Sequence, residues 1–232
     1  MPILELARKK KMSISRVEEY YNALRTNIQL SGENIRVIAV SSTFPGEGKT
    51  TTSTNLALTF AKAGHKTLLI DADIRNSKML GGVFKSDGKV TGLTEYLSGT
   101  TDLSQGLCET DEPNLFVVSS GQISPNPTAL LQSDRFATMM SVLRRHYDYI
   151  IVDTPPIGVV VDATLIAKVC DASLLVVAPK EVKRKMVQRS KMQLEQSSTP
   201  FLGVVLNKYN VEADKYGFYG SYGHYGDNLS KE

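Results

Sequence analysis

The sequence predicts an α/β fold in which helices flank a mostly parallel β-sheet. Short runs of Val, Ile and Leu alternate with longer stretches of helical character along most of the chain. The runs are apolar almost throughout instead of alternating with polar residues, as expected of strands that are buried on both faces. Connections between such strands are expected to be right-handed.

The apolar runs and the stretches between them define the predicted elements. The segment 76–111 is less regular, with many Gly, Ser and Thr residues and one short predicted helix at Leu93–Leu97. The predicted strands are Ile35–Val40, Thr67–Ile70, Leu115–Val118, Tyr149–Val152, Ser173–Val177 and Phe201–Leu206. The predicted helices are Lys49–Ala63, Thr128–His146, Val161–Lys168 and Glu181–Gln196.

The two ends of the chain differ from this pattern. The first dozen residues are expected to form an arm, followed by a helix from Ser15, as its N-cap, to Leu30. After Leu206 a repeated Tyr-Gly pattern opposes helix and predicts a flexible, tyrosine-rich tail. We therefore expect an arm and helix at 1–31, a main domain at 32–207 and the tail at 208–232.

Composition excludes several other classes of protein. The chain has 232 residues, of which 41% are hydrophobic and 22% charged, so it is neither disordered throughout nor a pure coiled coil. No apolar stretch is long enough to span a membrane. The net charge of +3 gives no argument for binding nucleic acid.

The cysteines and the N-terminus indicate a cytoplasmic protein. Cys108 and Cys170 have no metal-type spacing and are expected to be buried, reduced thiols. The basic run Arg8–Lys11 is not followed by an apolar segment of signal-peptide length. This run is either a solvated arm or a contact for an acidic surface.

The strongest motif is SSTFPGEGKTTT at positions 41–52. It follows a predicted strand and opens a helix, which is the context of a phosphate-binding P-loop. Thr43 replaces the usual first glycine of this motif, so an ordinary glycine-rich turn is the alternative. The glycines let backbone N–H groups point at phosphate oxygens. The residues predicted to bind nucleotide are Pro45, Gly46, Glu47, Gly48, Lys49, Thr50 and Thr51.

Acidic residues follow two other predicted strands. Asp71 and Asp73 end one strand and precede Arg75, and Asp153 ends another before Thr-Pro-Pro. Ligands of open α/β sheets bind at the carboxyl ends of strands, and clustered carboxylates need a cation there. A polar loop capped by one Asp is the alternative for the first group. With the P-loop, these residues predict a fold of P-loop NTPase type that binds Mg²⁺ and nucleotide.

These motifs, together with the terminal tyrosine cluster, make the chain resemble the bacterial tyrosine kinases (BY-kinases) of capsule and exopolysaccharide operons. The resemblance runs from Tyr20–Leu24 to the tail. It implies an ATP-dependent protein-tyrosine autokinase that regulates capsular or exopolysaccharide synthesis and export. No motif of a eukaryotic-type protein kinase is present in the sequence.

The resemblance also implies roles for individual residues. Lys49, Asp71, Asp73 and Arg75 are the implied catalytic residues, with Asp71 taking the proton of the acceptor hydroxyl. Mg²⁺ would be held by Thr50, Asp73 and Asp153. The implied phosphate acceptors are Tyr216, Tyr219, Tyr222 and Tyr225, and Tyr209 is a further candidate.

Partners follow from the same resemblance. A membrane-spanning polysaccharide co-polymerase would activate the kinase and recruit it to the inner face of the cell membrane, and a cognate protein-tyrosine phosphatase would reverse its reaction. The chain would form a ring, an octamer in the family, through Glu19 and Arg25 of the N-terminal helix. Asn22 departs from the family pattern of a second arginine there. No nucleic acid is implied.

Three questions stay open in the sequence. The basic segment Lys180–Lys191 is a solvated helix face or a docking surface for the tail or the co-polymerase. Asn207 lies at the adenine base or in an ordinary turn. The rival functions are a nucleotide-gated positioning ATPase, which usually carries a lysine where this chain has Phe44, and a non-enzymatic scaffold.

Overall fold

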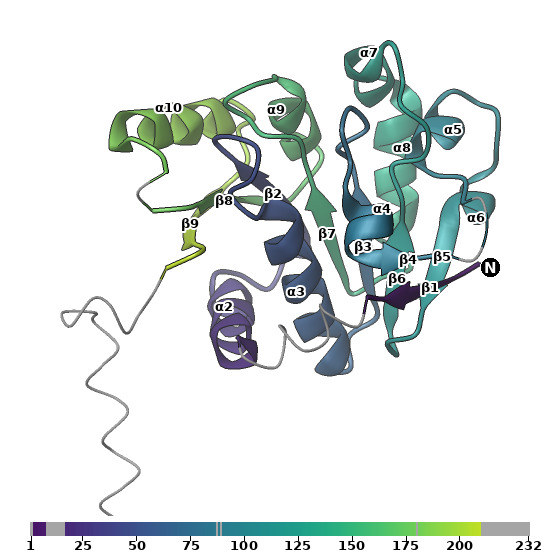
Figure 1. Cartoon of the computed structure of the whole chain (residues 1–232), viewed down its shortest axis with the longest axis horizontal. Coiled ribbons are helices and arrows are strands. Elements are labelled where there is room, and N and C mark those ends of the chain that lie inside the picture. The colour runs from purple at the N-terminus through teal and green to yellow at the C-terminus, as the bar shows by residue number, and fades with distance from the viewer. Residues whose placement is uncertain (1, 8–16, 87, 89, 180, 210–232) are drawn as a thin grey trace, which may run out of the picture.

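The fold is described by a computed structural model that covers residues 2–7, 17–86, 88, 90–179 and 181–209 (Figure 1). Its centre is a sheet with helices on both faces. All six predicted strands are present, with bounds that shift by at most two residues, and three short strands join them. The strands are β1 Ile3–Leu6, β2 Val37–Ser42, β3 Thr67–Asp71, β4 Phe84–Lys85, β5 Leu107–Thr110, β6 Leu115–Val118, β7 Tyr149–Asp153, β8 Ala172–Val177 and β9 Phe201–Leu206.

The helices follow the predicted order with differences at their ends. The segment predicted at 76–111 contains the predicted helix at 93–97 and two further short helices. The helices are α2 Glu18–Leu30, α3 Lys49–Lys62, α4 Met79–Gly82, α5 Leu93–Leu97, α6 Leu103–Gly106, α7 Pro127–Leu131, α8 Asp134–Leu143, α9 Asp162–Ala167 and α10 Arg184–Glu195.

Three predicted helices begin or divide differently in the structure. The stretch predicted as one helix at 128–146 is two, because Ser133 has an extended backbone between α7 and α8. Helix α10 begins three residues later than predicted, since Lys183 is also extended. Helix α2 begins at Glu18 and is preceded by Val17; the predicted N-cap, Ser15, lies outside the described residues.

The described strands form one sheet in the order β4-β1-β5-β6-β3-β7-β2-β8-β9. The prediction of a mostly parallel sheet is confirmed. The antiparallel pairs, β1 with β4 and β5 with β6, lie toward one edge of the sheet. The side chains of each central strand alternate between two buried clusters: Ile150 and Val152 of β7 belong to one, and Ile151 belongs to the other.

These two clusters are the cores on opposite faces of the sheet. One core contains Phe136 of α8, Ile166 of α9 and Leu194 of α10. The other contains Phe60 of α3 and Ile28 of α2. Figure 1 shows α2 and α3 together on one side of the strands. Such two-sided burial explains why the strands read as continuous apolar runs.

The expectation of an N-terminal arm is wrong for Ile3–Leu6. These residues form β1, which pairs in parallel with β5 and antiparallel with β4. Leu4 and Leu6 are buried, whereas Ile3 is 61% exposed. A four-residue strand whose partners lie about 80 and 105 residues away leaves almost no local signal, because non-local pairing defines it.

Two further expectations concern the thiols and membrane spans. Cys108 and Cys170 are free and buried, as predicted, and burial raises the pKa of Cys108 to about 11. None of the described helices is long and apolar enough to cross a bilayer.

The assignment of β1 to the sheet gives a direct prediction. Leu4→Ala should lower the free energy of unfolding by about 2–5 kcal/mol, because it removes a fully buried side chain. Ile3→Ala, on the exposed face of the same strand, should change it by no more than about 0.5 kcal/mol. Urea titration followed by circular dichroism measures both. Equal, small effects would mean that residues 3–6 are an arm after all.

Candidate functional site

The order of the central strands brings the predicted motifs together. Strands β3, β7 and β2 are neighbours in the sheet, in that order. Asp153 at the end of β7 lies opposite Asp71 of β3 on one side and opposite Val40 of β2 on the other. Because these strands are parallel, their carboxyl ends share one edge. The two acidic strand ends therefore sit beside the P-loop that leaves β2.

The P-loop has the backbone that its glycines allow. Gly46 and Gly48 have φ values of 90° and 97°, a left-handed region that favours glycine. Gly48 is also held by a close neighbour, because a Cβ atom at this position would lie 1.9 Å from Nδ2 of Asn207. Helix α3 begins directly after this residue, at Lys49. Its free N–H groups therefore face the loop.

Glu47 supports the loop from inside. It is 1% exposed, and its carboxylate accepts hydrogen bonds from the backbone N–H groups of Phe44, at 2.6 Å, and Ala178, at 3.2 Å. The Glu47 carbonyl accepts a bond of 2.8 Å from Asn207. Glu47 and Asn207 were both predicted to bind nucleotide. In the structure, their side chains tie the loop to the ends of β8 and β9. The nucleotide contacts of both residues stay predictions.

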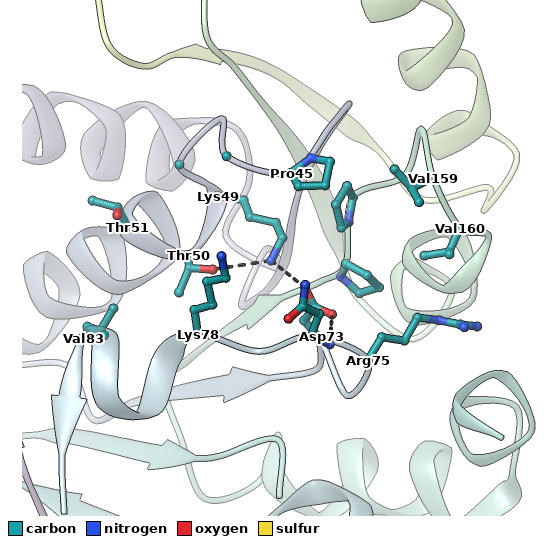
Figure 2. A pocket seen from close by; sticks show the side chains of 16 residues that line it. Pro45, Lys49, Thr50, Thr51, Asp73, Arg75, Lys78, Val83, Val159 and Val160 are labelled. Carbon is teal, nitrogen blue, oxygen red and sulfur yellow. Dashed lines mark hydrogen bonds and ion pairs between the residues drawn. The ribbon is translucent and has the colours of Figure 1, made fainter. Parts of the chain in front are cut away.

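Lys49 lies at the centre of a charged cluster (Figure 2). Its Nζ is 3.0 Å from Oδ2 of Asp73 and 3.7 Å from Oδ2 of Asp153. Thr50 Oγ1 donates to Oδ2 of Asp153 at 2.6 Å. Ser53, one turn further along α3, donates to the other oxygen of Asp153 at 3.1 Å. The structure thus brings together four predicted site residues, and Ser53 is an addition that the sequence motif did not indicate.

The electrostatics of this cluster leave excess negative charge. Burial raises the pKa of Asp153, although Lys49, Thr50 and Ser53 oppose the rise. Burial also acts to lower the pKa of Lys49, but the charges of Asp153 and Asp73 outweigh it and leave the pKa raised. One lysine therefore faces several buried carboxylates, an arrangement that an added cation stabilises.

Asp71 is fixed beside this cluster. It is 1% exposed, and the Ser77 hydroxyl donates to its Oδ2, while the backbone N–H of Asp73 lies 3.3 Å from its Oδ1. Burial, reinforced by the charge of Asp153, raises the pKa of Asp71 to about 7, even though Ser77 and Lys49 lower it. This carboxyl group therefore holds a proton more readily than an ordinary aspartate.

Arg75 points away from Lys49 in Figure 2. Its Nε donates to Oδ2 of the fully buried Asp162 at 2.6 Å, and its Nη2 donates to Thr128 at 2.8 Å. Thr128 in turn donates to Asp162 at 2.9 Å. Arg75 thus links the loop after β3 to α7 and α9. These contacts hold the guanidinium group within the chain. A catalytic role for Arg75 stays a prediction.

A pocket of about 400 Å³ opens over the cluster. Besides P-loop residues and Asp73, its walls contain side chains that no motif singled out, among them Lys78, Val83, Val159 and Val160. Lys78 lines the same pocket as Thr50, which adds a second cation to the pocket walls (Figure 2). Apolar walls with a few convergent polar groups are typical of small-molecule sites.

The donor set fits Mg²⁺ bound together with phosphate. Thr50 and Asp153 present oxygen atoms, the ligands that this hard cation prefers, and Asp73 lies within the same cluster. Within the described residues, no group of three or more His, Cys, Asp or Glu side chains is arranged to hold a metal by itself. Oxygen atoms of a nucleotide would have to complete the shell, as is usual for Mg²⁺.

The remaining predicted residues lie away from this pocket. Glu19 is exposed on α2. Arg25 donates from Nη1 to the Thr59 carbonyl of α3 at 3.2 Å, so part of its hydrogen-bonding capacity is used within the chain. The four predicted acceptor tyrosines, at 216, 219, 222 and 225, lie outside the described residues.

The role of Glu47 is testable by substitution. Glu47→Gln should lower the free energy of unfolding by about 1–3 kcal/mol, because an amide nitrogen replaces an acceptor of a buried N–H group. Glu33→Gln, at an exposed site before β2, should leave stability unchanged. Thermal unfolding by calorimetry compares the two. A Glu47 variant as stable as the Glu33 variant would contradict the supporting role.

Comparison with known proteins identifies the family. Residues 35–189 match the family described as an AAA domain. The tyrosine-protein kinase CpsD of Streptococcus pneumoniae is 62% identical over 226 residues, which cover 97% of this chain and 99% of that protein. The kinase domain of the Escherichia coli tyrosine kinase ETK superposes with a TM-score of 0.77 at 32% identity, over 83% of this chain and 77% of that one.

The cell division ATPase MinD of Pyrococcus furiosus is also similar, with a TM-score of 0.63 at 26% identity over 75% of this chain and 73% of that one. This similarity shows that the positioning ATPases and the tyrosine kinases share the P-loop fold. The sequence identity to tyrosine kinases over nearly the whole chain decides between the groups. The chain is a protein-tyrosine kinase and belongs to the bacterial tyrosine kinase (BY-kinase) family.

Proposed function

We propose that this chain transfers the γ-phosphoryl group of ATP to tyrosines of its own C-terminal cluster. The observation that carries the proposal is the cluster of Lys49, Thr50, Asp73 and Asp153. Lys49, Thr50 and Asp73 line one pocket, and Asp71 is buried beside the cluster. Phosphoryl transfer depends on positioning and on neutralising charge. This pocket offers both.

The P-loop and the N-terminus of α3 would bind the phosphates of the nucleotide. The left-handed glycines 46 and 48 turn the loop so that backbone N–H groups and the N-terminus of α3 face bound phosphates. Lys49 neutralises charge on the β- and γ-phosphate oxygens. When bound, Mg²⁺ supplies further neutralisation from a position held by Thr50, Asp73 and Asp153.

Asp71 is the proposed proton acceptor. A tyrosine hydroxyl has an ordinary pKa of about 10, so it attacks poorly at neutral pH unless a base takes its proton. Asp71 is the carboxylate beside the Lys49 cluster whose orientation Ser77 fixes. As the tyrosine oxygen bonds to the γ-phosphorus, the bond from this phosphorus to the β,γ-bridging oxygen breaks and ADP leaves. The proton of the tyrosine hydroxyl passes to the Asp71 carboxylate.

The proposed acceptors are Tyr216, Tyr219, Tyr222 and Tyr225. Residues 209 to 225 span about 53 Å when fully extended, at about 3.3 Å per residue, which is enough to reach a pocket on the same chain or on a neighbour. We favour transfer between copies, in line with the family resemblance.

The proposed setting is capsule or exopolysaccharide synthesis and export. There a membrane-spanning co-polymerase activates the kinase at the inner face of the membrane, and a phosphatase resets it. The support is the family resemblance and the close relation to CpsD. A ring of copies, an octamer in the family, would form through α2.

Phosphate mapping tests the activity. With Mg-ATP and the cytoplasmic peptide of a co-polymerase, mass spectrometry should find phosphate on the tail tyrosines. Lys49→Met should abolish it, because the phosphates lose their central cation. Lys62→Met, on the exposed end of the same helix and paired with Glu18, should retain it. ATP hydrolysis without phosphotyrosine would instead support the positioning ATPase, and neither reaction would support the scaffold.

The base can be tested separately from nucleotide binding. Asp71→Asn should reduce the rate of tail phosphorylation by about 10²–10⁴-fold while ADP affinity changes little. Asp134→Asn, at an exposed site on α8, serves as the control. Retained phosphorylation in the Asp71 variant would remove this residue from the reaction.

The proposed ring makes α2 a testable surface. Glu19 and Tyr20 are exposed on this helix, and Tyr20 is 60% exposed. Glu19→Arg should dissociate the assembly, because it reverses the charge of a proposed contact, whereas Glu33→Arg should not. Light scattering on the unphosphorylated protein measures the mass. An unchanged assembly in the Glu19 variant would argue against this contact.

A further inference from the structure

Helix α10 carries a cluster of cations on its outward side. We call Lys183, Arg184, Lys185 and Arg189 the α10 basic face; all four are exposed. In the part of the chain that the structure describes, none of them has an acidic partner. The nearby acids are used elsewhere, since Glu181 pairs with Lys208 and Glu195 pairs with Lys191.

These cations do not stabilise the helix that carries them. Ser190 and Leu194 provide the buried side of α10, and the cations take no part in that packing. Cations in a first helical turn oppose the helix dipole, and like charges four residues apart, such as Lys185 and Arg189, repel each other. The basic face therefore costs helix stability, which an anionic ligand would recover.

The C-terminal segment leaves the domain next to this face. Lys208, just before the end of the described chain, places its Nζ 3.0 Å from Glu181, in the segment that leads into α10. Helix α10 is about 18 Å long at 1.5 Å per residue. The seven residues from Tyr209 to Tyr216 extend to about 23 Å, so the tyrosine cluster can reach the whole face.

The positive charge of the α10 basic face favours the phosphorylated form of the C-terminal segment over the unphosphorylated form. Residues 210–232 contain four acidic residues and two lysines, so their side chains sum to −2. Each phosphate adds about −1.5 to −2, so four phosphotyrosines add about −6 to −8. Phosphate oxygens also accept paired hydrogen bonds from arginine, which the face supplies twice.

We propose that the α10 basic face binds the phosphorylated C-terminal segment of this chain. The proposal rests on the proposed function, because that reaction supplies the phosphotyrosines. Docking would keep the reacted segment on the surface of α10 and away from the nucleotide pocket. The site would thus sense how far the tail has been phosphorylated.

A synthetic peptide separates this proposal from the kinase activity itself. Peptide 210–232 with phosphate on Tyr216, Tyr219, Tyr222 and Tyr225 is titrated with the full, dephosphorylated chain in fluorescence anisotropy, without nucleotide. Binding should be saturable, weakened by salt and at least about tenfold tighter than that of the unphosphorylated peptide. Because the phosphates are supplied chemically, a failure of autophosphorylation would leave this result untouched.

Charge reversal locates the site. The double variant Lys185→Glu and Arg189→Glu should weaken phosphopeptide binding by at least about tenfold. The matched double variant Lys62→Glu and Lys66→Glu, away from α10, should bind within about twofold of the unchanged chain. Circular dichroism checks that both variants fold. Equal binding by the two variants, or equal binding of both peptides, would overturn the proposal.

An anionic membrane is the competing ligand for such a face. Sedimentation with vesicles of phosphatidylserine and phosphatidylcholine tests it on the same variants. If vesicles bind through Lys185 and Arg189 while the phosphopeptide does not bind, the face is a membrane contact and the proposal is wrong. Phosphopeptide binding that vesicles fail to compete for supports it.

Discussion

The rest of the site depends on the parallel register that sets Asp71 opposite Asp153 beside the strand that leads into the P-loop. This register places buried carboxylates around Lys49, whose ammonium group is 3.0 Å from Asp73 and 3.7 Å from Asp153. Buried carboxylates close to one another are costly unless cations compensate them. The lysine compensates part of that charge, and the remainder makes the pocket suited to a divalent cation with its nucleotide.

The P-loop is supported by hydrogen bonds to residues at the ends of neighbouring strands. The Glu47 carboxylate accepts hydrogen bonds from the backbone N–H groups of Phe44 and Ala178, and the Asn207 side chain donates to the Glu47 carbonyl. These bonds connect the P-loop to the ends of β8 and β9, at the far side of the sheet from β1. A rigid loop loses little freedom when ligand binds, which is the physical basis of preorganisation.

Local sequence predicted six of the strands and the main helices, because burial on both faces leaves continuous apolar runs. It missed β1, β4 and β5, which are two to four residues long. Strand β1 pairs with β4 and β5, which lie about 80 and 105 residues further along the chain. Local sequence also joined α7 to α8, since the helical periodicity continues across Ser133, where only the backbone changes direction. Motif spacing found Lys49, Thr50, Asp73 and Asp153, but gave no sign of Ser53, Lys78 or Asp162.

By itself, then, the sequence determined the fold class, the phosphate-binding loop and the acidic strand ends, because each depends on residues close together in the chain. Only the tertiary structure decided how these parts are used. It turned Glu47 and Asn207 inward to support the loop, paired Arg75 with Asp162, and bound Arg25 to Thr59. Those roles depend on which groups meet across the sheet, and contacts between distant segments are set by packing and register, which local spacing does not encode.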